Sequence, residues 1–228
     1  MNIEVSSLCK SYKKRLVLQN VSFKAQSGDI IGIAGGNGSG KSTLLSILAG
    51  SGKADSGTFL LDGRDLFKDR KSFSSSIGYV PQNTVLFEEL SGKDNLRLWY
   101  SKEELEKALC SQGILSLLDL QSFMNKNVAA MSGGMKKRLS IACALSKNPG
   151  LLLLDEPSSA LDLACKEKLY QWYKAFAQKG GIIILVTHDP QELQLCSKTF
   201  VLKENLLLPY KYSGDTKDLI HFFQEEGE

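Results

Sequence analysis

A glycine-rich segment near the start of the chain has the residue types and spacing of a phosphate-binding loop. It fits the pattern G-x-x-x-x-G-K-[ST] and consists of Gly35, Gly36, Asn37, Gly38, Ser39, Gly40, Lys41 and Ser42, followed by Thr43. Glycines let backbone N–H groups turn inward around phosphate oxygens, and a helix that begins near Lys41 would direct its positive end at them. The pattern predicts that Lys41 contacts the β- and γ-phosphates of a nucleotide and that Ser42 ligates Mg²⁺.

Two adjacent carboxylates follow an apolar run at residues 151–154. They are Asp155 and Glu156, and Pro157 comes directly after them. With a phosphate loop upstream, Asp155 at the end of a buried strand is expected to hold the metal, and Glu156 to polarise the attacking water. The alternative is a helix N-cap followed by an acid in the first turn.

A third motif is the Ser-Gly-Gly turn formed by Ser132, Gly133 and Gly134. It leads into a predicted helix, whose N-terminus would offer a second anion site. Taken alone, the turn is only a capped helix start. Its place about 20 residues before the acidic strand end makes it informative.

The elements that must position these motifs are strands alternating with helices. Apolar runs at 3–8, 17–23, 30–33, 57–61, 77–80, 151–154 and 182–187 predict strands, and residues 41–49 and 161–178 predict helices. Continuous apolar strands alternating with helices indicate a largely parallel sheet covered on both faces. Residues 83–148 instead show helical spacing, with amphipathic helices expected at 102–109 and 138–145.

The sequence therefore predicts one domain of class α/β. Residues 1–82 and 149–228 are expected to form the α/β core, with an antiparallel β part near the N-terminus. Residues 83–148 are expected to form a helical subdomain inserted into that core.

Composition limits the partners. The 228 residues carry a formal net charge of +3, which is too mild to argue for nucleic acid. The five cysteines are odd in number and lack C-x-x-C spacing, which argues against disulfides or structural zinc and favours a reducing compartment. No apolar run is long enough to cross a bilayer and the N-terminus does not look like a signal peptide, so a cytoplasmic location is expected.

The motifs together resemble the ATP-binding cassette (ABC) family, in which the Ser-Gly-Gly turn is similar to the signature loop. Tyr12 matches the aromatic residue that stacks on adenine in this family, and Gln82 matches the glutamine that contacts metal and water. Residues 158–162, which end in Asp162, match the loop that crosses to a second subunit. His188 matches the histidine that contacts the γ-phosphate. The resemblance extends from Tyr12 to His188.

This resemblance implies a P-loop NTPase (RecA-like) core that binds ATP and Mg²⁺. It implies Glu156 and His188 as catalytic residues, and Ser42, Gln82 and Asp155 as the metal site. Two cassettes of the family pair head to tail, so the Ser-Gly-Gly turn would close on ATP held by the partner cassette. Membrane-spanning subunits would be the other partners, with this chain peripheral on the cytoplasmic face of the membrane.

Two residues depart from the family pattern. Met131 replaces a leucine, and Met135 replaces a glutamine. The latter resembles the drug-, lipid- and polysaccharide-exporter branch, which implies export. Two alternatives stay open: a cassette ATPase acting on nucleic acid or ribosomes, and a non-hydrolysing regulatory cassette.

A surface for the membrane partner is expected between Gln82 and Tyr100. An apolar cluster next to Glu88 and Glu89 is typical of a docking surface, and it consists of Val85, Leu86, Phe87 and Leu90. Trp99 is instead expected to pack inside the helical subdomain.

Overall fold

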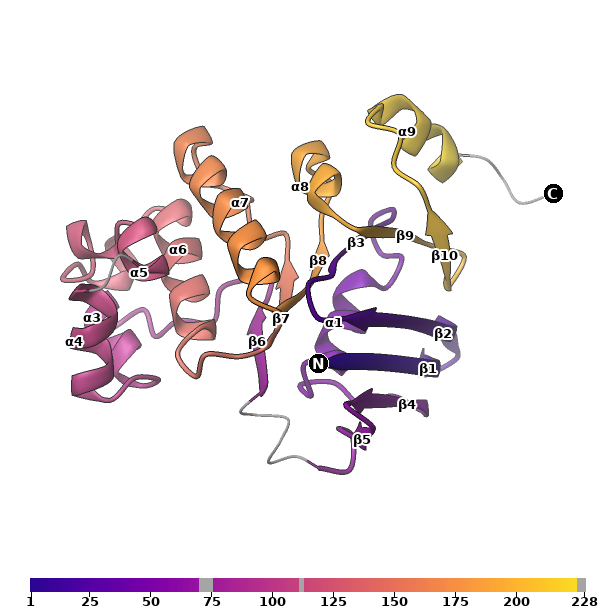
Figure 1. Ribbon diagram of the computed structural model, residues 1–228, viewed down its shortest axis with the longest axis horizontal. Coiled ribbons are helices and arrows are strands. Elements are labelled where there is room, and N and C mark those ends of the chain that lie inside the picture. The colour runs from indigo at the N-terminus through magenta and orange to yellow at the C-terminus, as the bar shows by residue number, and fades with distance from the viewer. Residues whose placement is uncertain (70–75, 111–112, 225–228) are drawn as a thin grey trace.

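The computed structural model describes residues 1–69, 76–110 and 113–224 (Figure 1). Six strands form a sheet in the order β10-β9-β3-β8-β7-β6, and within it β9, β3, β8, β7 and β6 run parallel while β10 is antiparallel to β9. The strands are β3 (Ile30–Ala34), β6 (Ile77–Val80), β7 (Leu151–Asp155), β8 (Ile182–Val186), β9 (Lys198–Lys203) and β10 (Leu206–Tyr210). This confirms the predicted α/β class with a mostly parallel sheet.

The three central strands explain why the chemistry-bearing motifs meet. Every residue of β3, β7 and β8 is buried, as expected for parallel strands covered on both faces. Their register pairs Ile33 with Val186, and Val186 with Asp155. The carboxyl ends of the three strands therefore lie level at one edge of the sheet, and the loops that follow them start side by side.

A second, antiparallel sheet has the order β2-β1-β4-β5 and packs on helix α1 (Lys41–Leu48). Its strands are β1 (Asn2–Tyr12), β2 (Arg15–Gln26), β4 (Ser56–Leu61) and β5 (Arg64–Asp65). Leu44 and Leu48 of α1 are fully buried in one apolar cluster with Val5 and Phe59 of this sheet and Ile33 of β3. The antiparallel N-terminal part is confirmed, and it fixes α1 against the main sheet.

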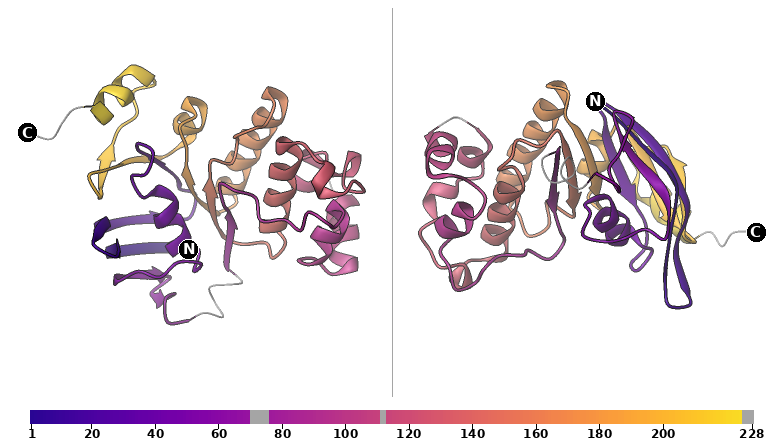
Figure 2. Two further views of the ribbon diagram at one scale, coloured as in Figure 1. Left: turned by 180° about the vertical axis from the view of Figure 1, so that it is seen from behind. Right: turned by 90° about the horizontal axis from the view of Figure 1, so that it is seen from below.

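Between β6 and β7 the described chain is helical, and it lies at the end of the molecule opposite the antiparallel sheet (Figures 1 and 2). The helices are α3 (Gly92–Arg97), α4 (Lys102–Cys110), α5 (Ile114–Leu117), the 3₁₀ turns η1 (Leu120–Ser122) and η2 (Val128–Ala130), and α6 (Gly133–Ala144). A second apolar cluster joins this part to α7 (Leu163–Gln178) through Leu139, Leu169 and Tyr173.

The expectation for Trp99 is wrong. Its side chain is 54% exposed, whereas Leu96 and Tyr100 of the same segment are buried. Spacing of four residues puts Leu96 and Tyr100 on one face, and the Tyr100 hydroxyl donates a hydrogen bond to the Ala142 carbonyl at 2.9 Å. Trp99 lies in the turn after α3, where its ring stays exposed.

The C-terminal segment completes the main sheet. After α8 (Pro190–Leu195), β9 pairs parallel with β3 and β10 folds back on β9. Helix α9 (Thr216–Gln224) covers this edge, with the Phe222 ring 5.0 Å from that of Tyr210. None of the helices in the described ranges is long and apolar enough to span a bilayer.

Candidate functional site

Two glycines shape the glycine-rich loop and two others leave it open. A Cβ atom on Gly35 would stand 2.5 Å from the Leu202 carbonyl oxygen, so the loop passes too close to β9 for a side chain. Gly40 has a φ of +109°, and a Cβ there would meet Val17 Cγ1 at 2.8 Å. At Gly36 and Gly38 nothing lies within 4 Å of such a Cβ. The loop is therefore tightly held from behind and open in front, as a phosphate cradle must be.

Lys41 lies beneath this loop with its ammonium group already desolvated. The side chain is 7% exposed, and Nζ donates hydrogen bonds to the carbonyl oxygens of Gly35 at 2.7 Å and Gly36 at 2.8 Å. Burial lowers the pKa of Lys41, against the opposing effect of the negative charges of Glu156 and Asp155. The cation is thus held at the loop by backbone oxygens.

A cavity opens in front of the loop toward the antiparallel sheet. The Tyr12 ring is half exposed at this cavity, and Lys10 Nζ lies 5.0 Å from the ring centroid. A flat aromatic face beside a phosphate cradle suits a nucleotide base. The cavity is lined by Tyr12, Arg15, Val17, Gly38, Gly40, Lys41, Ser42 and Thr43.

Asp155, the last residue of β7, is 2% exposed, and its Oδ2 atom has no hydrogen-bond partner in the described part of the chain. Burial raises the pKa of the Asp155 carboxyl, although a hydrogen bond from the Ser42 side chain opposes this. A buried carboxylate oxygen without a partner, beside a hydroxyl, fits a hard divalent cation such as Mg²⁺. Among the described residues no three or more His, Cys, Asp or Glu side chains are arranged so that they could hold a metal ion by themselves.

Three further residues predicted for the site lie close together after the ends of β6, β7 and β8; they are Gln82, Glu156 and His188. Gln82 Nε2 donates a hydrogen bond to Glu156 Oε2 at 3.3 Å, and His188 Nε2 lies 3.8 Å from Glu156 Oε1. Burial is the main cause that lowers the pKa of His188, and the positive charge of Lys41 adds to it. Since the ordinary value is 6.5, the imidazole is mostly neutral at pH 7.

Glu156 is held in an unusual backbone conformation. Its φ is +46°, which costs a residue with a side chain of the order of 1 kcal/mol or more. Its N–H donates to the Val186 carbonyl at 2.9 Å, and Ser159 Oγ donates to the Glu156 carbonyl at 2.7 Å. These bonds turn the Glu156 side chain toward Gln82 and His188.

The remaining predicted residues lie at a second place. Ser132 caps α6, with its Oγ accepting a hydrogen bond from the Met135 N–H at 3.3 Å, and Asp162 caps α7. Gly134 approaches the loop before Asp162 so closely that a Cβ would stand 2.6 Å from the Ala160 carbonyl oxygen. In the described chain these contacts join the Ser-Gly-Gly turn to residues 158–162, and not to the glycine-rich loop.

Sequence reasoning missed Lys137, which is 3% exposed. Its Nζ donates to the carbonyl oxygens of Gln82 at 3.0 Å, Pro81 at 3.3 Å and Asp155 at 3.5 Å, and burial lowers its pKa. In the sequence it stands within a basic run that looks solvated. The available signal was its position four residues before Ile141, on the buried side of a predicted helix.

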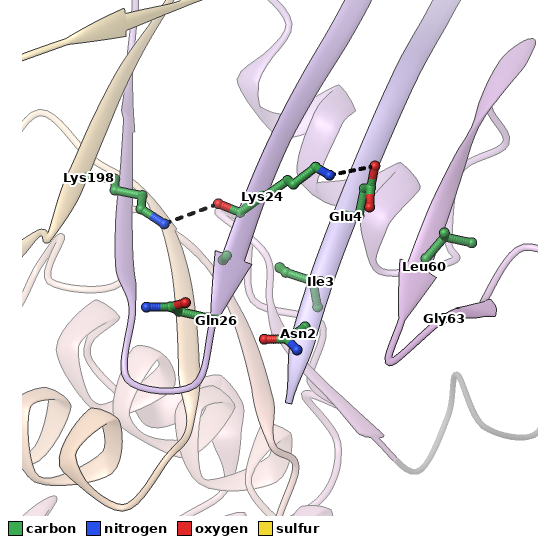
Figure 3. Close-up of a pocket in the computed structure, with 9 residues that line it drawn as sticks. Asn2, Ile3, Glu4, Lys24, Gln26, Leu60, Gly63 and Lys198 are labelled. Atoms are coloured by element: carbon green, nitrogen blue, oxygen red, sulfur yellow. Dashed lines mark hydrogen bonds and ion pairs between the residues drawn. The ribbon is translucent and has the colours of Figure 1, made fainter.

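Another hollow, on the antiparallel sheet, contains none of the predicted site residues (Figure 3). Lys24 Nζ pairs with Glu4 Oε1 at 3.0 Å across it, and Lys198 Nζ donates to the Lys24 carbonyl at 3.4 Å. Lys24 and Glu4 of this hollow pair with each other and no motif residue lines it, so the site at the strand ends is the better candidate.

Known proteins resemble this chain over most of its length. A family model described as ABC transporter matches residues 18–159, and a model of an AAA domain matches residues 125–194. The chain is 34% identical over 209 residues to the probable sulfate/thiosulfate import ATP-binding protein CysA of Chlorella vulgaris, covering 90% of this chain and 88% of that protein. It is also 34% identical to the Nod factor export ATP-binding protein I of Sinorhizobium fredii, covering 88% of this chain and 60% of that protein.

Solved structures have the same fold. An ATP-binding subunit of an ABC transporter superposes with a TM-score of 0.83 at 26% identity, covering 99% of this chain and 95% of that one. The ATP-binding cassette MJ0796, a dimer in a post-hydrolysis state with ADP and Pi, gives 0.82 at 29% identity, covering 92% and 98%. The chain therefore belongs to the ABC transporter family as an ATP-binding subunit, an ATPase whose hydrolysis powers transport.

Proposed function

We propose that hydrolysis takes place where the ends of β3, β7 and β8 meet, with Glu156 as the residue that activates water. The observation that carries this proposal is the convergence of Gln82 and His188 on the two oxygens of Glu156, next to buried Asp155. Gln82, Glu156 and His188 follow three different strands, β6, β7 and β8, yet they form one polar cluster beside the glycine-rich loop.

In this proposal the glycine-rich loop and Lys41 bind the phosphates. The open faces of Gly36 and Gly38 admit phosphate oxygens to backbone N–H groups at the start of α1. Lys41 then exchanges its hydrogen bonds to two loop carbonyls for bonds to phosphate oxygens. Tyr12 stacks on adenine at the outer end of the cavity.

Mg²⁺ would be held by Ser42, Asp155 and Gln82, and it would neutralise charge on the phosphate oxygens. The unpartnered Oδ2 of Asp155 supports this set. Glu156 takes up a proton from a water molecule as the water oxygen forms a bond to the γ-phosphorus, and it releases this proton before the next turnover. The bond to the bridging oxygen of ADP breaks, and phosphate and ADP are the products. Neutral His188 donates a hydrogen bond to the γ-phosphate.

A second cassette completes the site in this proposal. Ser132, Gly133, Gly134 and Asp162 lie on a surface shared by the starts of α6 and α7, apart from the glycine-rich loop. Head-to-tail pairing would bring this surface to the ATP of the partner cassette. Leu163, next to Asp162, is 81% exposed and would be covered by that pairing.

Residues 83–148 form the helical subdomain in this proposal, and membrane-spanning subunits would dock on it. Its exposed large apolar side chains are Val85, Phe87, Leu98 and Trp99, which we assign to a docking patch. An exposed apolar patch of this kind suits a helix from a membrane subunit. The chain would then lie on the cytoplasmic face of the membrane. Met135 favours export as the direction of transport.

The test is the substitution Glu156→Gln, which keeps the shape of the side chain and removes its charge. ATP turnover should fall by about 100-fold or more, because general-base catalysis contributes about 10²–10⁴-fold. ATP binding, measured by titration, should be retained. The matched control is Glu103→Gln on exposed α4, which should be as active as the wild type. Turnover of Glu156→Gln within about tenfold of wild type would falsify the assignment.

A further inference from the structure

Lys137 is a charged side chain placed where the chain otherwise buries apolar ones. It is 3% exposed, and its neighbours on α6, Leu139 and Ile141, are buried apolar residues. Burying an ammonium group is costly unless it is hydrogen-bonded. An apolar side chain would fill the same space without this desolvation cost. The lysine at this position therefore indicates that its N–H donors have a function.

The hydrogen bonds of Lys137 go to both sides of the catalytic cluster. Nζ donates to the carbonyl oxygens of Pro81 and Gln82, which follow β6, and reaches that of Asp155 at the end of β7. The Gln82 side chain in turn donates to Glu156, the residue after Asp155. The ammonium group therefore fixes the backbone at both ends of the Gln82–Glu156 hydrogen bond.

The two neighbouring basic residues have different roles. Lys136 forms an ion pair with Glu88 at 2.7 Å near the surface, and Arg138 lies over the Phe123 ring, 4.7 Å from its centroid. Both contacts stay within the helical part. Among these three residues, Lys137 is the one whose side chain reaches the strand ends of the main sheet.

We propose that Lys137 is a positioning residue for ATP hydrolysis. Its ammonium group holds Gln82 and Glu156 at a fixed separation and makes α6, which starts at the Ser-Gly-Gly turn, move together with them. The proposal rests on the catalytic roles of Glu156 and Gln82 given above. Lys137 lines no part of the cavity in front of the glycine-rich loop, so its loss should affect the chemical step and leave ATP binding nearly unchanged.

The experiment compares Lys137→Met with Lys136→Met, the same change one position earlier. Steady-state ATPase assays of the full chain should show kcat reduced by about 100-fold in Lys137→Met, because a small misplacement of a catalytic group can cost that much. KM for ATP should stay within about threefold. Lys136→Met should keep kcat within about twofold of wild type. Lys137→Arg keeps a charged donor and should retain most of the wild-type kcat, unlike the uncharged Lys137→Met.

Stability measurements separate positioning from folding. The midpoint of urea unfolding is measured for Lys137→Met and for Lys137→Gln. The kcat comparison then uses the variant that keeps the wild-type midpoint. A folded neutral variant with wild-type kcat overturns the proposal, and so does an equal loss of kcat in Lys136→Met. If Glu156→Gln itself keeps turnover, the proposed catalytic role fails first. If Glu156→Gln is inactive and a folded Lys137 variant is active, the positioning role alone fails.

Discussion

The side-chain amide of Gln82 donates a hydrogen bond to the Glu156 carboxylate at 3.3 Å, across 74 residues of sequence. The other oxygen of the same carboxylate lies 3.8 Å from His188 Nε2. The loops after β6 and β8 thus each supply one neighbour to a residue that follows β7. Any movement of either loop changes the surroundings of Glu156 directly.

Lys41→Ala should weaken ATP binding by at least about tenfold. The change removes a desolvated ammonium group from the phosphate site, and a hydrogen bond to a charged group is worth about 1.5–3 kcal/mol. Isothermal titration with ATP would measure Kd. The control is Lys53→Ala, an exposed lysine outside the glycine-rich loop. Unchanged affinity in the Lys41 variant would place the phosphates elsewhere.

Two glycines of the loop should respond differently to alanine. Gly40→Ala should lower the free energy of unfolding by about 1–3 kcal/mol, because its φ of +109° and the Val17 contact oppose a Cβ. Gly36→Ala meets nothing within 4 Å and should be nearly as stable as the wild type. Its methyl group would occupy the open face of the cradle, so its ATP affinity should fall. Urea unfolding and ATP titration check both; equal stability of the two variants would contradict the loop geometry.

Glu192 should make stability depend on pH. Its side chain is fully buried and hydrogen-bonded to the Thr187 hydroxyl, and burial raises its pKa from 4.5 to about 7. The folded chain thus binds this proton more tightly than the unfolded chain. The stabilisation is complete below pH 4.5 and is lost as the pH rises through 7. At about 1.4 kcal/mol per pH unit, the full effect is of the order of 3 kcal/mol.

Glu192→Gln removes this titration. Urea midpoints between pH 5 and pH 8.5 should show the wild type losing stability relative to the variant as the pH rises. Subtracting the two curves cancels the contribution of the other titrating groups. A difference that is flat, or that grows in favour of the wild type at high pH, would contradict the assignment.

Phe87→Asp should leave the chain folded and able to bind ATP, yet prevent co-purification with its membrane subunits. The Phe87 side chain is 58% exposed, while its backbone N–H and carbonyl are bonded to the Asn95 side chain at 2.9 and 3.0 Å. The backbone therefore keeps its position when the ring is lost. Phe123→Asp, at a buried site, should instead unfold the helical part. Assembly of Phe87→Asp at wild-type yield would move the docking surface elsewhere.

The fold and the place of the predicted chemistry followed from local patterns. Local sequence determines the buried strands β3, β7 and β8 and the glycine-rich loop after β3. The spacing of their residues therefore identifies them. Lys137 and Trp99 were not predicted correctly because burial depends on distant segments. The residues around Lys137 do not reveal that Pro81, Gln82 and Asp155 approach it, and those around Trp99 do not reveal that its ring, in the turn after α3, is exposed.

Strands β9 and β10 show the same limit: β10 lies at the edge of the main sheet, and β9 lies between β10 and β3. Pro209 within β10 weakens the strand signal of that segment, because proline has no N–H to donate to a sheet. Pairing of β9 with β3 decides their structure. The left-handed backbone conformation of Glu156 could not be predicted from the sequence either, because glutamate does not favour a positive φ.

Ser132 and Asp162 each cap a helix of their own chain, through the N–H groups of Met135 and Cys165. Such caps stabilise a protein by about 1 kcal/mol. Selection for folding alone would therefore retain both residues in a descendant that had lost hydrolysis. Glu156 offers no such benefit, since its backbone conformation opposes folding. In an evolving lineage, replacement of the glutamate would mark the loss of catalysis, whereas survival of the serine and aspartate would only record the ancestry of the fold.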